Sequence, residues 1–452
     1  MQNRVVNLLL ATLFSLAVSS QTSAQEQASA SKLDELMSHY ASHDKFMGTV
    51  AVSKDGKLIF HKQYGMRLPG EQSSPDEQTQ YRIGSITKTF TAVMIMQLIE
   101  QGKLSLDTKL SEYFPNVKNA ESITVGQLLG HRSGVGSMTD DPTYKDWFTD
   151  EKDRDEMVEI IVRQPTVFEP GEQQRYSNSN YVLLGYILEK ATGKPYADLL
   201  QTQVCEPAGL TRTEYMKPAS GESNVARSFR RTGKDWEPES QTDPSVPHGA
   251  GAIMSTASDL TRFADALFGG KLIGKESLDE MTPDGLGMGN GLFAFPFGQK
   301  RAYGHNGGID GFQSNLGYFP EDKVAVAMIT NGIAHSMNDI MIGVLSNTYG
   351  IPVELPNFDQ VDVEVPEDVL EKYVGVYARD KFPIKLTVTR EGGVLSCQGT
   401  GQPVLPLAAS SETEFRADVA SAVIVFSESE AGKGFDTLLL KQGGAALEFT
   451  KE

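Results

Sequence analysis

The sequence predicts an α+β protein: an antiparallel sheet flanked by helices, with an inserted all-helical lobe, followed by a small C-terminal antiparallel β domain. Three observations support this class. β-Prone segments lie near both ends of residues 25–351, and the segments between them mostly have the apolar periodicity of helices. Beyond residue 351 the pattern changes to short β-prone runs separated by glycine-rich turns.

Length and charge limit the domain count and the partners. The chain has 452 residues, of which 39% are hydrophobic, and this predicts one large domain and one smaller domain. The formal charge is -18, with acidic residues spread along the chain, which disfavours nucleic acid and anionic membranes as partners. We attribute the charge to solubility, and the small-molecule or peptide substrate that we expect follows from the motifs described below.

Residues 1–24 have the pattern of a secretory signal peptide. Arg4 precedes an apolar stretch from Val5 to about Val18, and small polar residues lead to Ala24. The apolar stretch is short for a transmembrane span of about 20 residues. We expect no membrane span after cleavage and a periplasmic or secreted location.

After the signal, the sequence predicts a short helix over residues 33–40 and two strands, 48–52 and 58–64. The turn Lys54-Asp55-Gly56 should join these strands as a hairpin.

Near residue 350 the chain returns to a β pattern. Residues 313–319 and 324–330 flank a turn at Pro320-Glu321-Asp322, and a helical pattern follows over residues 335–349. We expect strands from both ends of the region to form one antiparallel sheet.

Between these ends the sequence is mostly helical. Helices are predicted over residues 85–101, 125–129, 155–163, 180–192 and 258–268. So long an insertion predicts a helical region beside the sheet, with a cleft between the two.

Residues 352–366 are rich in proline and acidic residues, which is typical of a linker. They separate a first domain, residues 25–351, from a small β domain, residues 367–452. Runs such as 384–389, 423–426 and 437–440 predict a barrel-like arrangement in the second domain.

The two cysteines, Cys205 and Cys397, lie far apart in the sequence. An oxidising compartment would permit a disulfide only if the fold brought them together. We favour two unpaired structural thiols. Neither has metal-ligand spacing around it, so we predict no metal site and no cofactor.

The first chemical motif is Ser85-Ile86-Thr87-Lys88, which opens an apolar helix. Positions i and i+3 share a helix face, so the Lys88 amine can approach the Ser85 hydroxyl. A hydroxyl needs a positioned base, and a buried lysine loses its proton readily. Such a motif often arises by chance, with the serine only capping the helix. The preceding Gly84 and the apolar helix favour a nucleophile and its base.

The second motif is Tyr176-Ser177-Asn178. Tyr176 can relay a proton between Ser85 and a leaving group, so both Lys88 and Tyr176 are candidates for the general base. The Asn178 amide can hold Lys88 and a substrate carbonyl. Taken alone, a turn with capping chemistry explains these residues better, so their specificity comes from the combination.

The third motif, Tyr303-Gly304-His305-Asn306-Gly307-Gly308, leads into the predicted strand at 312–319. Along a cleft edge, His305 would face the substrate, and Gly307 and Gly308 would let a carbonyl approach the backbone closely. The N–H groups of Gly308 and Ser85 would then form an oxyanion hole. We assign no chemical role to His131, which we expect in a loop near the cleft mouth. Residues 248–252, His248 to Ala252, are interpreted as a close-packed turn without a chemical role.

In this order, Ser85-x-x-Lys88, Tyr176-x-Asn178 and His305-Asn306-Gly307 resemble the active-site motifs of serine β-lactamases, D-Ala-D-Ala peptidases and related esterases. The surrounding stretches YRIGSITKTFTA, FEPGEQQRYSNSNYVLLG and GHNGGIDGFQSNLGYFP resemble the class C β-lactamase and carboxypeptidase branch. The resemblance covers roughly residues 33–349 and implies an α/β sandwich with an all-helical lobe. The segment LEKYVGVYA resembles the start of a lipocalin-like appendage found on some of these hydrolases.

One departure from the family pattern affects the expected substrate. His305 stands where β-lactamases of this branch usually carry a lysine, and this resembles certain carboxypeptidases, D-amino-acid peptidases and esterases. The sequence predicts an exported serine hydrolase that forms an acyl-enzyme on Ser85, with the activity of a D-Ala-D-Ala carboxypeptidase-like peptidase or amidase, or of an esterase. The alternatives are a class C-type β-lactamase and a catalytically silent cell-wall-binding or regulatory protein. The natural substrate and the oligomeric state stay open.

Overall fold

The computed structural model describes residues 27–452 except 69–73, 217–223, 233–234, 359–361, 381, 403, 421, 429–434 and 443–444. The predicted signal peptide therefore lies outside the described residues. The chain forms two compact units: one comprises the chain up to Met37 and Met47–Gly332, and the other comprises Ser38–Phe46 and Ile333–Glu452. The predicted domain boundaries at residues 351 and 367 stay a proposal.

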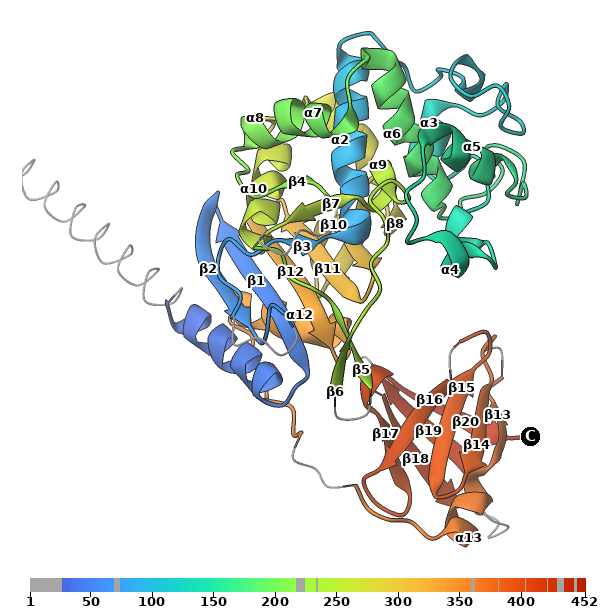
Figure 1. Ribbon diagram of the computed structural model, residues 1–452. Helices are drawn as coiled ribbons and strands as arrows, with labels where there is room; N and C mark the ends of the chain where they lie inside the picture. The colour runs from blue at the N-terminus through green and yellow to red at the C-terminus, as the bar shows by residue number, and fades with distance from the viewer. Residues whose placement is uncertain are drawn as a thin grey trace, which may run out of the picture. The chain divides into compact units, whose positions relative to one another are not determined.

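A seven-stranded sheet in the order β2-β1-β12-β11-β10-β9-β8 lies in the first unit (Figure 1). It joins strands from both ends of the region, which confirms the predicted arrangement. The β1–β2 hairpin turns at Asp55 and Gly56, whose φ angles are 50° and 72°, as a type I′ turn requires. The strands are β1 (Phe46–Lys54), β2 (Lys57–Tyr64), β8 (Gly287–Met288), β9 (Phe293–Phe297), β10 (Lys300–Ile309), β11 (Phe312–Phe319) and β12 (Val324–Ile333).

The Tyr303–Gly308 motif is itself part of a strand, which the sequence did not predict. It lies within β10, an internal strand between β9 and β11 and not an edge strand. The glycines of β10 lower its apparent β propensity, which explains why this strand was missed. The strand β9 was missed as well. The register with β9 runs only from Lys300 to Gly304, so the second half of β10 extends past its β9 partner.

The helices of the first unit lie in the predicted helical region. α10 contacts β2 and β11, while α2 contacts α6 and α9, and Figure 1 shows α2 and α10 beside each other. Phe90 of α2 stacks on Phe263 of α10 with the ring centroids 3.8 Å apart, so sheet and helices share one apolar core. The helices are α2 (Thr87–Glu100), α3 (Val125–Leu129), α4 (Tyr144–Trp147), α5 (Arg154–Val162), α6 (Asn178–Thr192), α7 (Tyr196–Leu200), α8 (Glu206–Ala208), α9 (His248–Gly251), α10 (Ala257–Phe268) and α11 (Lys275–Met281).

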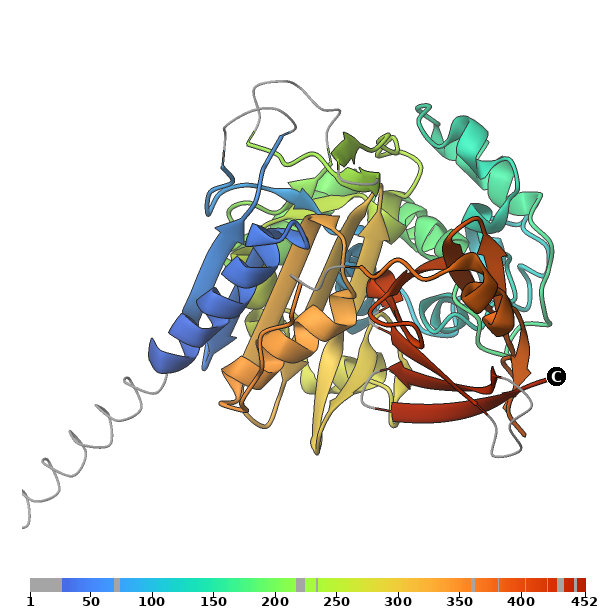
Figure 2. The same ribbon diagram turned by 90° about the horizontal axis from the view of Figure 1, so that it is seen from below.

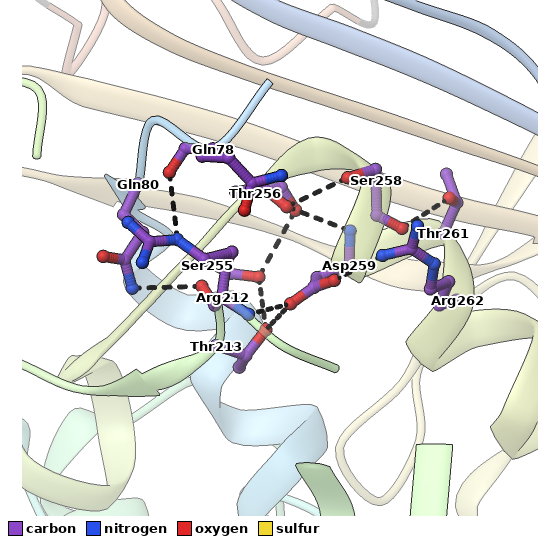
Figure 3. Close-up of polar contacts among 10 residues, drawn as sticks. All are labelled: Gln78, Gln80, Arg212, Thr213, Ser255, Thr256, Ser258, Asp259, Thr261 and Arg262. Atoms are coloured by element: carbon purple, nitrogen blue, oxygen red, sulfur yellow. Dashed lines mark hydrogen bonds and ion pairs between the residues drawn. The ribbon is translucent and has the colours of Figure 1, made fainter. Parts of the chain in front are cut away.

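A polar network fixes the start of α10 (Figure 3). The buried Asp259 carboxylate accepts hydrogen bonds from the Arg212 backbone N–H at 2.7 Å, from Thr213 Oγ1 at 3.1 Å and from Arg262 Nη1 at 2.8 Å. Thr213 also contacts the Ser255 hydroxyl of β7 (Ile253–Ser255) at 2.7 Å. β7 pairs with β3 (Tyr81–Arg82) and β4 (Glu214–Tyr215), so the network supports the strand that leads to Ser85. A separate hairpin joins β5 (Phe229–Thr232) and β6 (Asp235–Pro238).

The second unit contains a closed antiparallel barrel, β13 to β20, which confirms the predicted barrel-like β domain. Aromatic side chains fill its core, including Tyr373, Phe415 and Phe426, so the barrel is packed inside. The elements of this unit are α12 (Met337–Thr348), α13 (Glu367–Leu370), β13 (Gly375–Ala378), β14 (Leu386–Glu391), β15 (Val394–Gly399), β16 (Val404–Ala409), β17 (Glu414–Ala417), β18 (Ala422–Glu428), β19 (Phe435–Gln442) and β20 (Ala445–Lys451). Figure 2 shows the strands of the barrel from a second direction.

Cys205 and Cys397 are buried free thiols, as expected. Burial raises the pKa of Cys205 to about 12 and that of Cys397 to about 11, so both stay protonated and unreactive near neutral pH. Within the part of the chain that the structure describes, no helix has the length and apolar character needed to cross a membrane.

Candidate active site

Ser85 lies at a sharp strand-to-helix turn. The short 3-10 turn Gly84–Ile86 follows β3 and runs directly into α2. Gly84 has a φ of 50°, and a Cβ atom there would lie 2.8 Å from the backbone nitrogen of Gly308. Only glycine fits this position, and the turn leaves Ser85 half-buried at the start of the helix.

Lys88 is fully buried one helical turn after Ser85. Its Nζ lies 2.9 Å from Ser85 Oγ, 2.9 Å from Asn178 Oδ1 and 2.8 Å from the carbonyl oxygen of Ala250. Burial lowers the pKa of Lys88 well below its usual value, because a charged amine loses its hydration there. Lys88 is thus poised to exist as a neutral amine.

The three partners of Lys88 determine the direction of its lone pair. A neutral amine has two hydrogens and one lone pair, and Asn178 Oδ1 and the Ala250 carbonyl can only accept hydrogen bonds. When Lys88 is neutral, these two acceptors take both hydrogens. The lone pair then points to Ser85, the one partner of the three that can donate a proton. This is the geometry that a general base for a serine hydroxyl requires.

The ring of Tyr176 lies against the same amine, with the amine above the ring face. Lys88 Nζ lies 4.9 Å from the centroid of the Tyr176 ring, and the ring lies 4.4 Å from that of His131. Burial raises the pKa of Tyr176 above its usual value, and an interaction with the Ser85 hydroxyl opposes the rise. Tyr176 therefore stays protonated near neutral pH, which suits it to donate a proton.

His131 holds the backbone that carries Tyr176. Its Nδ1 accepts a hydrogen bond from the Ser177 N–H at 3.2 Å, and its carbonyl oxygen accepts one from the Arg175 N–H at 2.9 Å. Burial and the nearby Lys88 lower the pKa of His131 well below its usual value, so the ring is neutral and Nδ1 can accept. The sequence predicts only a loop at His131, and no signal in it places this residue beside Tyr176.

Asn178 is fixed by the segment that follows His131. Its backbone N–H donates to Ser137 Oγ at 3.1 Å, and its Nδ2 donates to Thr139 Oγ1 at 3.0 Å. With Nδ2 engaged, Oδ1 faces Lys88. The amide is thus held in one orientation, which gives Lys88 an acceptor on a fixed side.

His305 is buried beside these groups, with only 1% of its surface exposed. Its ring stacks on Phe293 with centroids 4.3 Å apart and lies 6.2 Å from that of Tyr176. Nδ1 donates to the carbonyl oxygen of Asn306, so Nε2 carries the lone pair, and Nε2 has no partner among the described residues. Burial, with a contribution from Lys88, lowers the pKa of His305 to about 3, and the ring is neutral at working pH.

Gly307 and Gly308 lie against the backbone of the nucleophile. A Cβ atom on Gly307 would lie 2.1 Å from the Ile83 carbonyl oxygen and 3.0 Å from the Ser85 nitrogen. Residues Ile309 and Phe312 face each other across the hairpin turn, and hydrogen bonding alternates along an antiparallel pair. The Gly308 N–H therefore points away from β11, past the end of β9, and can face Ser85.

The structure thus brings together the seven residues that the sequence singled out: Ser85, Lys88, Tyr176, Asn178, His305, Gly307 and Gly308. The sequence did not point to the contacts of Ala250, which lies in the segment 248–252, nor to those of His131 and Phe293. These contacts are tertiary, and no spacing in the sequence signals them.

A separate cavity of about 730 Å³ lies elsewhere in the first unit. Its wall includes Phe268, Tyr303 and Tyr318, and it shares none of the seven residues. Within the described ranges, no group of three or more His, Cys, Asp or Glu side chains is arranged to hold a metal ion. Among the described residues, the Ser85 cluster joins a hydroxyl to an amine whose pKa is lowered by burial, so we treat it as the candidate active site.

Comparisons with known proteins agree with this geometry. The Beta-lactamase family model matches residues 33–338. Penicillin-binding protein 4* of Bacillus subtilis (strain 168) is 26% identical over 425 residues, covering 86% of this chain and 92% of that protein. The octameric penicillin-binding protein homologue from Pyrococcus abyssi is similar in structure, with a TM-score of 0.66 and 26% identity, over 93% of this chain and 98% of that one. D-amino acid amidase from Ochrobactrum anthropi SV3, complexed with L-phenylalanine, gives a TM-score of 0.64 and 26% identity, over 71% and 98%.

Proposed function

Since this chain belongs to the Beta-lactamase family of penicillin-binding-protein-like serine hydrolases, we propose that it transfers an acyl group from an amide or ester to water through Ser85. The observation that carries the proposal is the geometry at Lys88. Its lone pair faces the Ser85 hydroxyl because two obligate acceptors, Asn178 Oδ1 and the Ala250 carbonyl, occupy its hydrogens.

Acylation begins with proton transfer from Ser85 Oγ to Lys88 Nζ across 2.9 Å. The serine oxygen forms a bond to the substrate carbonyl carbon, and the carbonyl oxygen becomes an oxyanion. The N–H groups of Ser85 and Gly308 stabilise this negative charge. The proton then passes from Lys88 through the Tyr176 hydroxyl to the leaving amine or alcohol, and the bond to the leaving group breaks.

Deacylation uses the same groups in reverse. Lys88, again neutral, takes a proton from a water molecule as the water oxygen attacks the acyl carbon of the Ser85 ester. The Ser85 oxygen leaves and regains a proton, which restores the free enzyme. The high pKa of Tyr176 means that its tyrosinate form is reprotonated readily, so the tyrosine can pass on a proton and regain one within each half-reaction.

His305 decides the substrate class. Its neutral ring offers a lone pair on Nε2 and no positive charge near neutral pH, and such a group repels a carboxylate and accepts from an N–H donor. We therefore place amides and esters of D-amino acids, and peptides cleaved away from a free carboxylate, ahead of β-lactams, whose carboxylate calls for a fixed cation. The structural likeness to a D-amino acid amidase supports this order.

We also propose a location for the mature protein. Residues 1–24 have the pattern of a signal peptide, and we propose that the mature protein acts outside the cytoplasm on small molecules or peptides.

A substrate panel tests the proposed function. Purified protein is assayed on a D-amino-acid amide, a D-Ala-D-Ala peptide, a short-chain ester and a chromogenic cephalosporin, with Ser85→Ala as the matched control. We expect turnover of the amide or ester that the control lacks. A cephalosporin hydrolysed with a higher kcat/KM than every other substrate would replace the proposal with β-lactamase activity. No Ser85-dependent turnover and no Ser85 adduct on any substrate would support a catalytically silent protein.

A further inference from the structure

A buried ion pair joins the strand ahead of Ser85 to the turn after Gly308. Arg82 Nη1 donates to Asp310 Oδ2 at 2.7 Å, and the two side chains are only 7% and 3% exposed. Arg82 ends β3, three residues before Ser85, and Asp310 follows the last residue of β10. The pair therefore spans the two chain segments whose N–H groups face the proposed oxyanion.

The Asp310 carboxylate is bound on both oxygens. Besides Arg82, Thr242 donates its backbone N–H to Oδ2 at 3.0 Å and its hydroxyl to Oδ1 at 2.5 Å. Arg82 also donates to the Thr242 carbonyl at 2.8 Å and to Gln241 Oε1 at 3.2 Å. The Ser228 hydroxyl donates to the backbone carbonyl of Asp310. Three separate segments thus fix the β10–β11 turn.

Stability alone gives a weak reason to keep such a pair. Two buried charges lose their hydration, and apolar residues of similar volume often stabilise a fold as well or better. An ion pair instead fixes the distance and direction between the two segments that carry it, because a guanidinium and a carboxylate bind in a defined geometry. The position of this pair therefore points to a role in alignment.

The two segments touch directly between the ion pair and the site. A Cβ on Gly84 would lie 2.8 Å from the Gly308 nitrogen, and the Ser314 hydroxyl donates to the Ile83 carbonyl at 2.8 Å. With the backbones already in contact, a small shift of the turn would move Gly308 relative to Ser85. Oxyanion donors act only within a narrow range of distance and angle.

We propose that the Arg82–Asp310 ion pair is a clamp that sets the spacing of the Ser85 and Gly308 N–H groups, and so aligns the oxyanion hole. The inference rests on the proposed function of this site. Arg82 and Asp310 are positioning residues, because they act through the backbone of Ser85 and Gly308 and do not touch the substrate.

Two variants test the clamp by different means. Asp310→Glu keeps the charge and lengthens the side chain by one methylene, while Asp310→Asn keeps the length and removes the charge. The matched control is Asp322→Glu, which lengthens the partner of Lys300 in an ion pair of 2.8 Å at the other end of β10. Each protein is titrated with an acylating ester, so that rates refer to competent sites and not to total protein.

The readouts are kcat, KM and the inhibition constant of a boronic acid, whose tetrahedral serine adduct places an oxygen in the hole. For Asp310→Glu and Asp310→Asn we expect kcat per titrated site to fall about 10- to 100-fold. The affinity for the boronic acid should fall by a similar factor. The KM should stay within about 2-fold, because the oxyanion hole binds the transition state more strongly than the substrate. Asp322→Glu should match the wild type.

The outcomes separate the clamp from the proposed function. Wild-type kcat and boronic acid affinity per titrated site in both Asp310 variants would overturn the clamp, whatever the folded fraction. A wild-type protein that forms no Ser85 adduct would overturn the proposed function, and the clamp with it.

Discussion

Replacing Lys88 with methionine tests the proposed base while disturbing the fold as little as the site allows. Lys88 is fully buried in α2, and Nζ makes three hydrogen bonds. Methionine is a flexible, apolar side chain of similar length, so the Lys88→Met variant fills the same space and removes only the amine.

The expected loss of activity follows from the geometry. Removing a positioned proton-transfer group slows a reaction by about 10² to 10⁴-fold, and at 1.36 kcal/mol for each factor of ten this raises the barrier by about 2.7 to 5.4 kcal/mol. The free energy of unfolding should change less. Asn178 Oδ1 and the Ala250 carbonyl lose a donor, at about 1 to 3 kcal/mol each, but the desolvation of a buried amine disappears as well.

Stopped-flow acylation by a chromogenic ester measures the step directly, and circular dichroism on heating confirms that the variant is folded. In the wild type, acylation should rise with pH as Lys88 loses its proton, and the lowered pKa moves this rise to a lower pH than that of a solvated lysine. The rise should vanish in Lys88→Met. A wild-type acylation rate or an unchanged pH profile in the variant would refute Lys88 as the base and leave Tyr176 as the candidate.

Three further predictions concern the neighbours of this base. Tyr176→Phe should slow acylation about 100-fold or more for a substrate with a poor leaving group and less for an activated ester, since its hydroxyl protonates the leaving group; equal effects on both would contradict that role. His131→Leu removes the acceptor of the Ser177 N–H and should lower the free energy of unfolding by about 1 to 3 kcal/mol and kcat with it, while His131→Asn, whose Oδ1 can replace Nδ1, should restore both in urea titrations and steady-state assays. His305→Lys should raise kcat/KM for carboxylate-bearing substrates relative to neutral esters. Because burial lowers the pKa of His305 to about 3, titration of this ring should not change the wild-type substrate preference between about pH 5 and pH 8. A wild-type preference that changes near the ordinary histidine pKa would show that the ring becomes charged and would contradict this prediction.

The elements that local chemistry specifies were predictable from the sequence. The helix at 125–129 matched its prediction, and in the structure Thr124 and Gln127 form the capping box that starts it. The Asp55-Gly56 turn matched because both residues accept positive φ angles. Ser85 and Lys88 met because their spacing of three residues places them on one helix face.

The remaining features depend on contacts between distant segments. Arg82 and Asp310 are 228 positions apart, and Ala250 lies 162 positions from Lys88, so no local pattern signals either contact. The strand β10 was missed because its glycines, needed where Gly307 meets the Ile83 carbonyl, weaken the β pattern. The residues that complete the site through tertiary contacts were therefore not predictable from the sequence, whereas the residues of its three motifs were.

The most direct measurement is the mass of the protein during turnover of a slowly released ester or amide, followed by peptide mapping. The proposed mechanism predicts one acyl group on the peptide that contains Ser85 and none in Ser85→Ala. An acyl group on any other residue, or full turnover by Ser85→Ala, would contradict it.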